Sequence, residues 1–320
     1  MYKFIIYHPF NKHRLNFTKD VFLDFFKDFP NTIVSYVETE DQFHQELRNA
    51  DFIIGLSFEK SIYKYAKKLK AIFTCMAGRE SIPKPPHSKI SCYYGSFHGK
   101  LISESLLSGM AYFNQKFSLL NKSKEQKIWC SNFDFGSRVQ LSKQSIGIFG
   151  FGAIGRYCAQ YLSKLGMKVY GIQRTHSHGF CPFSHAEYIN VNQTDNLIAN
   201  LNHIVSFLPQ SKETKFFFDE KFFSKMSKSA CFYNFGRGHC VVEKDLSNAL
   251  HSQKISGALL DVFQQEPLDK NSILWQTPNL IITPHISTYY TNYFQEYAIE
   301  LKQQITIELK KTSSHYKRDL

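Results

Sequence analysis

Residues 145–155 read SIGIFGFGAIG, and this stretch decides the fold of the chain. Residues 146–149 form a short apolar run with β-branched side chains, which is typical of one buried strand. Three glycines follow with the spacing G-x-G-x-x-G, namely Gly150, Gly152 and Gly155. Helical spacing continues over 156–165, and a second strand is expected at 167–172, where a strand–helix–strand unit needs it.

Glycine has no Cβ atom, so backbone N–H groups and the positive end of the helix dipole can reach a pyrophosphate at such a turn. Three glycines alone are a weak signal, because glycine turns are common. The strand before them and the helix after them make the motif specific. The stretch therefore predicts dinucleotide binding, and an ordinary strand–helix turn is the alternative.

Length and composition indicate a globular chain with two domains. The chain has 320 residues, of which 43% are hydrophobic. No apolar run approaches the length of a membrane span, and the N-terminus has the pattern of a first strand instead of a signal peptide. Seven cysteines are scattered and never have C-x-x-C spacing, so we expect a cytoplasmic protein without a disulfide framework or a metal site.

The formal net charge is +12, which suits anionic small molecules or nucleic acid. Lysines and arginines are dispersed, with local runs only at 64–70 and 310–318. We therefore interpret most of this charge as a solvated surface and expect neither nucleic acid nor a membrane as a partner. The phenylalanines at 216–218, 222 and 223 have helical spacing, which favours core packing over a base-stacking platform.

Strand and helix patterns alternate over residues 1–100, which predicts a parallel α/β sheet. We expect helices at 41–48 and 59–69, and a helix after Thr18 or Asp20 that buries a row of phenylalanines. A long helix at 101–117 connects to a second α/β unit, which starts at residue 145. A mostly irregular segment at 121–143 separates the two, and a closing helix is expected at 289–311.

Three polar signatures follow expected strands in the second half of the chain. The first is Asn-Phe-Gly-Arg-Gly at 234–238, in which Arg237 can bind a carboxylate through two parallel hydrogen bonds. The second holds Asp261 and Glu266. The third is Pro-His at 284–285, and histidine is well suited to proton transfer near neutral pH. Ligands of open α/β sheets lie at the carboxyl ends of strands, so these residues form a candidate site. A surface arginine, a helix-capping acid and a satisfied histidine are the alternatives.

These residues together resemble the D-isomer-specific 2-hydroxyacid dehydrogenases, and the similarity is strongest from about residue 97 to 288. Shared features are the glycine turn, Leu-Pro at 208–209 with Glu-Thr at 213–214, N-x-G-R-G, L-D-V followed by E-P-L at 260–268, and Pro-His. The resemblance implies an α/β fold with two Rossmann-like or flavodoxin-like parallel-sheet domains and a cleft between them. It implies a substrate-binding domain at 1–99 and 289–320, and a dinucleotide-binding domain at 100–288. It also implies a homodimer.

The same resemblance implies that NAD(P)H reduces a small anionic 2-oxoacid to the D-2-hydroxyacid. Arg237 would bind the substrate, and His285 would protonate its carbonyl oxygen while Glu266 holds the imidazole. The loop Ala77, Gly78 and Arg79 would bind the substrate carboxylate through its backbone. The implied cofactor contacts are Gly150, Gly152, Ala153, Ile154, Gly155, Gln173, Arg174, Thr175, Leu208, Pro209, Phe235, Gly236 and Asp261.

The residues that follow the strand expected at 167–172 bear on the choice of cofactor. NAD enzymes usually place an acid there to bind the ribose 2′-hydroxyl, but this chain has Gln173, Arg174 and Thr175. Because these side chains accept a 2′-phosphate that an acid would repel, we predict NADP(H) over NAD(H). Stacking of Arg174 on adenine is the alternative.

The chain departs from the family pattern at Arg79 and Glu80 and at Tyr289 and Tyr290, which leaves the identity of the acid open. The tyrosines suit a small acid such as glyoxylate or hydroxypyruvate, and the extra arginine suits a second anionic group. Two other functions stay open: a dinucleotide-sensing protein similar to the corepressor relatives of the family, and a dehydrogenase of formate or a phosphorus oxyanion on the same scaffold.

Overall fold

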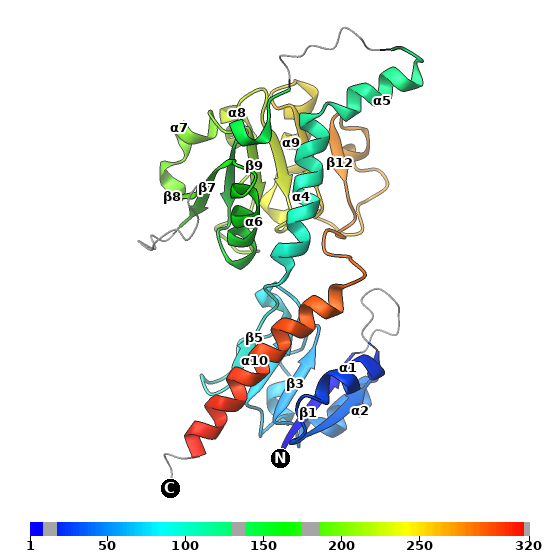
Figure 1. Cartoon of the computed structure of the whole chain (residues 1–320), viewed down its shortest axis with the longest axis vertical. Helices are drawn as coiled ribbons and strands as arrows, with labels where there is room; N and C mark the ends of the chain where they lie inside the picture. Colours follow the sequence, from blue (N-terminus) through cyan, green and yellow to red (C-terminus); the bar gives the residue numbers. More distant parts are fainter. Residues whose placement is uncertain (9–17, 130–137, 175–185, 317–320) are drawn as a thin grey trace. The chain divides into compact units, whose positions relative to one another are not determined.

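The computed structural model describes residues 1–8, 18–129, 138–174 and 186–316. The chain divides into two compact units (Figure 1). Unit 1 comprises Met1–His98 and Tyr289–Leu320, and unit 2 comprises Gly99–Thr288. The boundary expected from the sequence falls one residue later, and the functions predicted for the two units stay predictions.

Unit 1 is a five-stranded parallel sheet with the strand order β2-β1-β3-β4-β5. Its strands are β1 (Tyr2–Tyr7), β2 (Thr32–Val37), β3 (Phe52–Gly55), β4 (Ala71–Thr74) and β5 (Ser91–Tyr93). Its helices are α1 (Lys19–Phe26), α2 (Glu40–Leu47), α3 (Ile62–Tyr65) and α10 (Tyr293–Tyr316). Every residue of β3 and β4 is buried, as expected for central strands covered on both faces.

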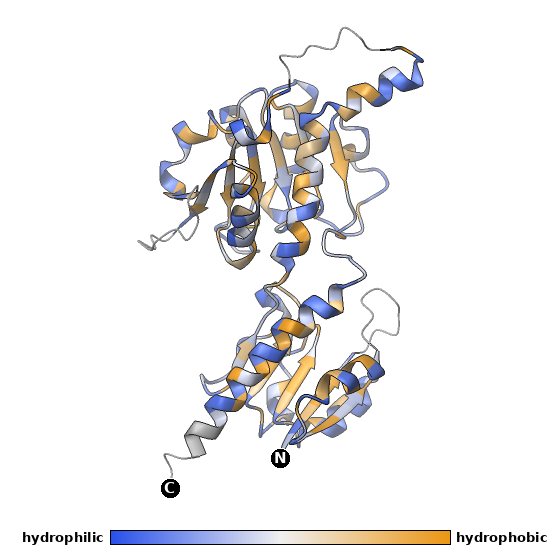
Figure 2. Ribbon diagram, in the orientation of Figure 1, coloured by the Kyte–Doolittle hydropathy of each residue, from blue (hydrophilic) through white to orange (hydrophobic). Residues whose placement is uncertain are grey.

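Local signals explain the helices of unit 1. The Thr18 hydroxyl accepts a hydrogen bond from Val21 N at 3.4 Å, which confirms the expected cap of α1. The expected helix at 59–69 is limited to α3, because Ala66 (ψ 71°) leaves the helical conformation. The closing helix begins at Tyr293, and hydrophobic and hydrophilic residues alternate along the part that is coloured in Figure 2, with Leu301 and Ile305 buried.

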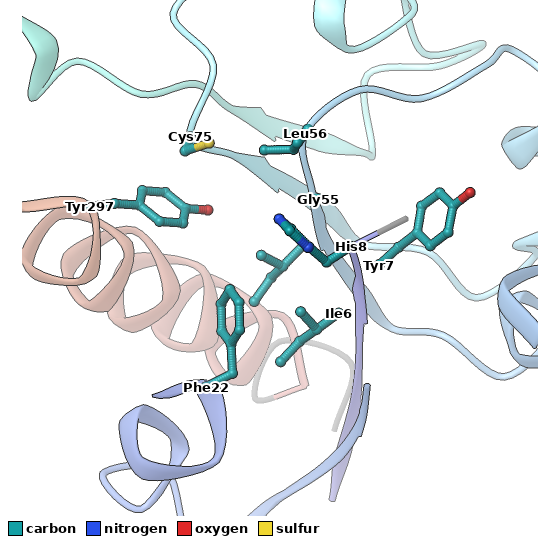
Figure 3. A pocket seen from close by; sticks show the side chains of 9 residues that line it. Ile6, Tyr7, His8, Phe22, Gly55, Leu56, Cys75 and Tyr297 are labelled. Carbon is teal, nitrogen blue, oxygen red and sulfur yellow. The ribbon is translucent and has the colours of Figure 1, made fainter. Parts of the chain in front are cut away.

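A small cavity lies at the carboxyl ends of β1 and β3 in unit 1 (Figure 3). The phenol of Tyr297 and the imidazole of His8 point into it, and the ring of Phe22 closes one side. Its volume of about 10 Å³ is close to the minimum that one water molecule needs. The cavity is therefore too small for an organic acid.

Unit 2 is a seven-stranded parallel sheet with the strand order β12-β11-β10-β9-β6-β7-β8. Its strands are β6 (Ser145–Phe149), β7 (Lys168–Gln173), β8 (Ala186–Asn190), β9 (His203–Ser206), β10 (Cys231–Asn234), β11 (Gly257–Leu260) and β12 (Leu280–Ile282). Its helices are α4 (His98–Asn114, which starts at the boundary), α5 (Phe117–Glu125), α6 (Ala153–Ser163), α7 (Asp195–Ile198), α8 (Glu220–Lys225) and α9 (Glu243–His251). Counted from β6, the order is 3-2-1-4-5-6-7, and it reverses between β6 and β9, where doubly wound sheets bind their ligands.

The long helix expected at 101–117 is broken. Lys116 has a left-handed backbone (φ 58°), which ends α4 and starts the separate helix α5 in a segment expected to be irregular. No residue of α5 is buried, and α5 points away from the sheet of unit 2 (Figure 1).

Phenylalanines fill the core of unit 2. Phe218, Phe222 and Phe223 are buried, and Phe149 stands at 5.5 Å and 5.3 Å from the rings of Phe218 and Phe222. The prediction of core packing is confirmed for them. The expected helix holds for Phe222 and Phe223, which lie in α8, but it is wrong for Phe218, which precedes α8 and pairs with Val241 in an isolated bridge. Phe216 stays outside the core and is 43% exposed.

Along the described ranges, none of the helices combines the length and the apolar character that crossing a membrane requires.

A buried histidine sits at the start of β9. His203 Nδ1 lies 3.0 Å from the hydroxyl of Tyr233, and its Nε2 lies 2.6 Å from Gln144 Oε1. Gln144 Nε2 donates to Asn114 Oδ1 and Val139 O, so Oε1 is the atom left to accept from the imidazole. Burial lowers the pKa of His203 from 6.5 to about 3. The folded protein therefore keeps this ring neutral.

This histidine makes the stability of unit 2 depend on pH. The unfolded chain binds a proton on His203 below pH 6.5, whereas the folded chain does so only near pH 3. The free energy of unfolding should therefore fall as the pH drops from 6.5 toward 3, by about 1.4 kcal/mol for each unit. Denaturant unfolding at several pH values should show a shallower dependence in His203→Gln than in the wild type or in His251→Gln, an exposed control. Equal dependence in all three would contradict this.

Candidate functional site

The glycine turn between β6 and α6 is shaped to receive an anion. Gly150 has a positive φ of 94°, and a Cβ atom there would lie 2.7 Å from the backbone of Phe207. A Cβ on Gly155 would lie 2.4 Å from the carbonyl oxygen of Gly150, so the turn packs directly on the helix. A Cβ on Gly152, by contrast, would meet nothing within 4 Å. The turn is closed on its protein side and open where a ligand would approach.

The first residues of α6 supply the donors for such a ligand. Gly152 is the N-cap and makes no side-chain capping hydrogen bond, and both Gly152 and Ala153 are exposed. Helix N-termini leave backbone N–H groups without intrahelical partners, and these bind phosphate oxygens well. The residues present therefore fit the pyrophosphate of a dinucleotide, with Ala153 and Ile154 as the N–H donors.

The loop after β9 joins this turn to the next strand end. A Cβ on Gly236 would lie 2.6 Å from the carbonyl oxygen of Leu208, and the backbone of Leu208 also stands 3.0 Å from the Cβ position of Gly150. Thr214 Oγ1 donates to Pro209 O at 2.6 Å and holds the loop. Three of the predicted cofactor contacts, on three different loops, are thus in direct contact.

The end of β7 presents the residues predicted to select the cofactor. Gln173 is half-buried, and the exposed Arg174 follows it. Arg174 Nη1 lies 4.0 Å from Glu213 Oε2, a residue of the loop after β9. Thr175 lies outside the described residues.

Asn234 braces the loop that carries Arg237. Its buried side chain accepts from Gly236 N at 3.1 Å and donates to Arg237 O at 3.2 Å. The Arg237 guanidinium donates to Gly236 O at 2.9 Å, and Phe235, the first residue of the loop, is buried. A Cβ on Gly238 would lie 1.9 Å from the backbone of Phe263, so this loop packs closely on the segment after β11.

Asp261 holds the loop that carries His285. Its carboxylate is buried and accepts from the Thr283 hydroxyl at 2.6 Å, from Ile286 N at 3.0 Å and from Ser287 N at 3.2 Å. Its backbone oxygen accepts from His285 N at 2.8 Å. His285 itself has a left-handed backbone (φ 54°), which is uncommon for residues other than glycine and is fixed here by these bonds.

Glu266 and His285 form a pair. His285 Nδ1 donates to Glu266 Oε2 at 2.8 Å, and the other carboxylate oxygen accepts from Phe263 N at 3.0 Å. The side chain of His285 is 53% exposed. Because Nδ1 faces the carboxylate, Nε2 is the nitrogen that can give a proton to a ligand.

The loop predicted to bind a substrate carboxylate belongs to unit 1. Ala77 and Arg79 are exposed, and Gly78 O accepts from the hydroxyl of Ser81 at 2.7 Å. The role of this loop stays a prediction.

The sequence singled out Arg237, Glu266 and His285 but assigned no role to Asn234 or Thr283, which fix the loops around them. The asparagine at the end of an apolar strand, next to two glycines, was the available signal. Among the residues that the structure describes, no group of three or more His, Cys, Asp or Glu side chains is arranged to hold a metal ion.

The strand order and the glycine turn define unit 2 as a Rossmann-type domain. The family model for the D-isomer specific 2-hydroxyacid dehydrogenase, NAD binding domain, matches residues 107–287. The chain therefore belongs to the D-isomer specific 2-hydroxyacid dehydrogenase family.

Two curated relatives illustrate the similarity. A probable 2-ketogluconate reductase from Dictyostelium discoideum is 34% identical over 192 residues, which are 58% of this chain and 56% of that protein. The chain thus spans little more than half the length of that relative. Glyoxylate/hydroxypyruvate reductase A from Citrobacter koseri is 30% identical over 234 residues, which are 69% of this chain and 72% of the relative.

Solved structures share the fold at lower identity. The NADPH-dependent glyoxylate/hydroxypyruvate reductase from Sinorhizobium meliloti, in complex with NADP and sulfate, has a TM-score of 0.77 and 22% identity, covering 96% of this chain and 94% of that one. A D-isomer specific 2-hydroxyacid dehydrogenase from Lactobacillus delbrueckii, in its NAD complexed form, has a TM-score of 0.74 and 20% identity, with coverages of 95% and 96%.

The hydrogen bonds of Asp261 predict a stability effect. In Asp261→Asn the amide nitrogen would replace one acceptor and face a backbone donor, either Ile286 N or Ser287 N. A buried mismatch of this kind should lower the free energy of unfolding by about 1–3 kcal/mol. Thr283→Val removes only the hydroxyl partner and should cost less. Denaturant unfolding measures both, and an Asp261→Asn variant as stable as the wild type would contradict the bracing role.

Proposed function

We propose that the protein reduces a small 2-oxoacid to the D-2-hydroxyacid with a nicotinamide dinucleotide as hydride donor. The observation that carries this proposal is the Glu266–His285 pair, a half-exposed imidazole with its Nδ1 held by a carboxylate at 2.8 Å. Family membership and the names of the relatives, which include glyoxylate/hydroxypyruvate and 2-ketogluconate reductases, support it.

Each residue has a proposed task. The cofactor, when bound, supplies the hydride to the carbonyl carbon of the substrate. His285 Nε2 gives the proton to the carbonyl oxygen, and Glu266 stabilises the charged imidazole and fixes its orientation. Arg237 binds the carboxylate and carbonyl oxygens, so that negative charge developing on the oxygen meets two cationic groups.

Further tasks are proposed for residues of each unit. In unit 2 the N-terminus of α6 binds the pyrophosphate, and Leu208, Pro209, Phe235 and Gly236 line the rest of the cofactor site. Asp261 binds the carboxamide of the nicotinamide. In unit 1 the backbone of Ala77, Gly78 and Arg79 binds the substrate carboxylate.

We propose NADP(H) as the preferred cofactor, because Gln173 and Arg174 stand where an acid would select NAD(H). The related structures hold NADP in one case and NAD in another, so the fold accommodates both.

We also propose a homodimer that forms through unit 2. The support is α5, which has no buried residue and carries the exposed side chains of Phe117 and Leu119, while Ile128 and Trp129 follow it at 56% and 91% exposure. Exposed apolar groups gathered in this way are typical of an interface.

The described cysteines are free thiols, and this fits the cytoplasm as the proposed location.

The proton-donor role of His285 predicts a selective defect. In His285→Gln, kcat with glyoxylate or hydroxypyruvate should fall about 10²–10⁴-fold, because general acid catalysis is lost. The dissociation constant for NADPH, from nucleotide fluorescence, should change little. Unchanged kcat would refute the role.

Absence of turnover by the wild type with any 2-oxoacid, formate or phosphite would favour the dinucleotide-sensing alternative.

The cofactor proposal predicts a higher kcat/KM with NADPH than with NADH for the wild type. Arg174→Gln should reduce this preference about tenfold or more, because it removes a charge-assisted hydrogen bond to the 2′-phosphate. Steady-state kinetics with a saturating 2-oxoacid test it. A higher kcat/KM of the wild type with NADH than with NADPH would contradict the proposal.

A further inference from the structure

Glu213 stands opposite the cation that is proposed to select the cofactor. Its Oε2 lies 4.0 Å from Arg174 Nη1, and the two side chains are 62% and 73% exposed. The two residues come from different loops: Arg174 directly follows β7, and Glu213 follows β9. Position 173, where an acid would contact a ribose, holds a glutamine. A carboxylate therefore does stand at the end of β7, but it faces Arg174 and comes from the loop after β9.

The loop that carries Glu213 is held in place by its own hydrogen bonds. Thr214 Oγ1 accepts from Ser211 N at 3.0 Å and donates to Pro209 O, and Phe216 N donates to His239 O at 2.9 Å. Hydrogen bonds from the side chain of Ser211 and from the backbone lower the pKa of Glu213, and the charge of Arg174 lowers it further by a smaller amount. The carboxylate is therefore charged at neutral pH.

We propose that Glu213 is a specificity-determining residue for the cofactor. Its carboxylate competes with a ribose 2′-phosphate for Arg174, and it accepts a hydrogen bond from a ribose 2′-hydroxyl when no phosphate is present. The inference rests on the proposed placement of Arg174 beside the ribose. In this proposal the two side chains act in opposite directions on cofactor choice. Arg174 favours NADP(H), and Glu213 weakens that preference so that the protein still binds NAD(H).

The charges set the expected size of the effect. An exposed ion pair contributes little, so a phosphate can displace the glutamate from the arginine. The remaining carboxylate still repels a nearby phosphate dianion. Removing its charge should therefore raise the ratio of affinities for the phosphorylated over the unphosphorylated nucleotide by about three- to tenfold.

Calorimetric titration of the full chain with two cofactor fragments tests this without turnover. The probes are adenosine 2′,5′-bisphosphate, which carries the 2′-phosphate, and 5′-AMP, which lacks it. The variants are Glu213→Gln, Arg174→Gln and the double variant. Glu220→Gln removes the same charge from an exposed site on α8 and is the matched control. We expect the affinity ratio to rise in Glu213→Gln and to stay unchanged in Glu220→Gln. It should also be higher in the double variant than in Arg174→Gln, because the repulsion between the Glu213 carboxylate and the phosphate does not need the arginine.

Two results would overturn the inference and leave the cofactor proposal intact. In the first, Arg174→Gln lowers the affinity for the bisphosphate, but Glu213→Gln leaves the ratio unchanged. In the second, Glu213→Gln weakens both nucleotides equally, which would make it a contact to the shared adenosine. If Arg174→Gln leaves bisphosphate binding unchanged, the placement of Arg174 fails and the inference fails with it.

Discussion

The buried carboxylate of Asp261 is the interaction on which the candidate site depends. It lies one residue past the end of β11 and binds the hydroxyl of Thr283 and the backbone N–H groups of Ile286 and Ser287. The backbone of Asp261 also accepts from His285 N and donates to Asn234 O. One residue thus connects the loops of three strands. Because a buried carboxylate without partners is costly, these donors are held in fixed positions, and so is the backbone of His285 between them.

Strand register gives this arrangement its geometry. Asn234 pairs with Leu260, and Leu260 pairs with Ile282, so β10, β11 and β12 end at the same level. Arg237 and His285 each lie three residues past their register positions, on loops that begin side by side. Close backbone contacts at Gly150, Gly236 and Gly238 then connect neighbouring loops. The glycine turn contacts the loop after β9, that loop contacts the loop after β10, and the loop after β10 contacts the segment that holds Glu266. The same packing that builds the turn therefore orders the polar residues.

The sequence predicted the parts of this structure that depend on local pattern. Apolar runs and glycine spacing were enough for the parallel sheets, and Thr18 was enough for the cap of α1. The sequence did not predict effects that depend on tertiary contacts. The left-handed backbone of Lys116 separates α4 from α5 where one helix to residue 117 was expected, and Phe218 is placed by pairing with Val241 instead of by a helix. For the site, residue types suggested Glu266 with His285, but only coordinates give their 2.8 Å contact or the approach of Glu213 to Arg174.

Transfer of isotope from cofactor to product is the most direct test of the central claim, that these strand ends form the active site of a 2-oxoacid reductase. NADPH deuterated at C4 of the nicotinamide, as separate samples for each face, would be incubated with the protein and glyoxylate or hydroxypyruvate. The account predicts that one of the two samples delivers deuterium to C2 of the hydroxyacid, with D configuration in the product from hydroxypyruvate, as NMR and chiral analysis would show. Cofactor binding without deuterium transfer to any 2-oxoacid would contradict it.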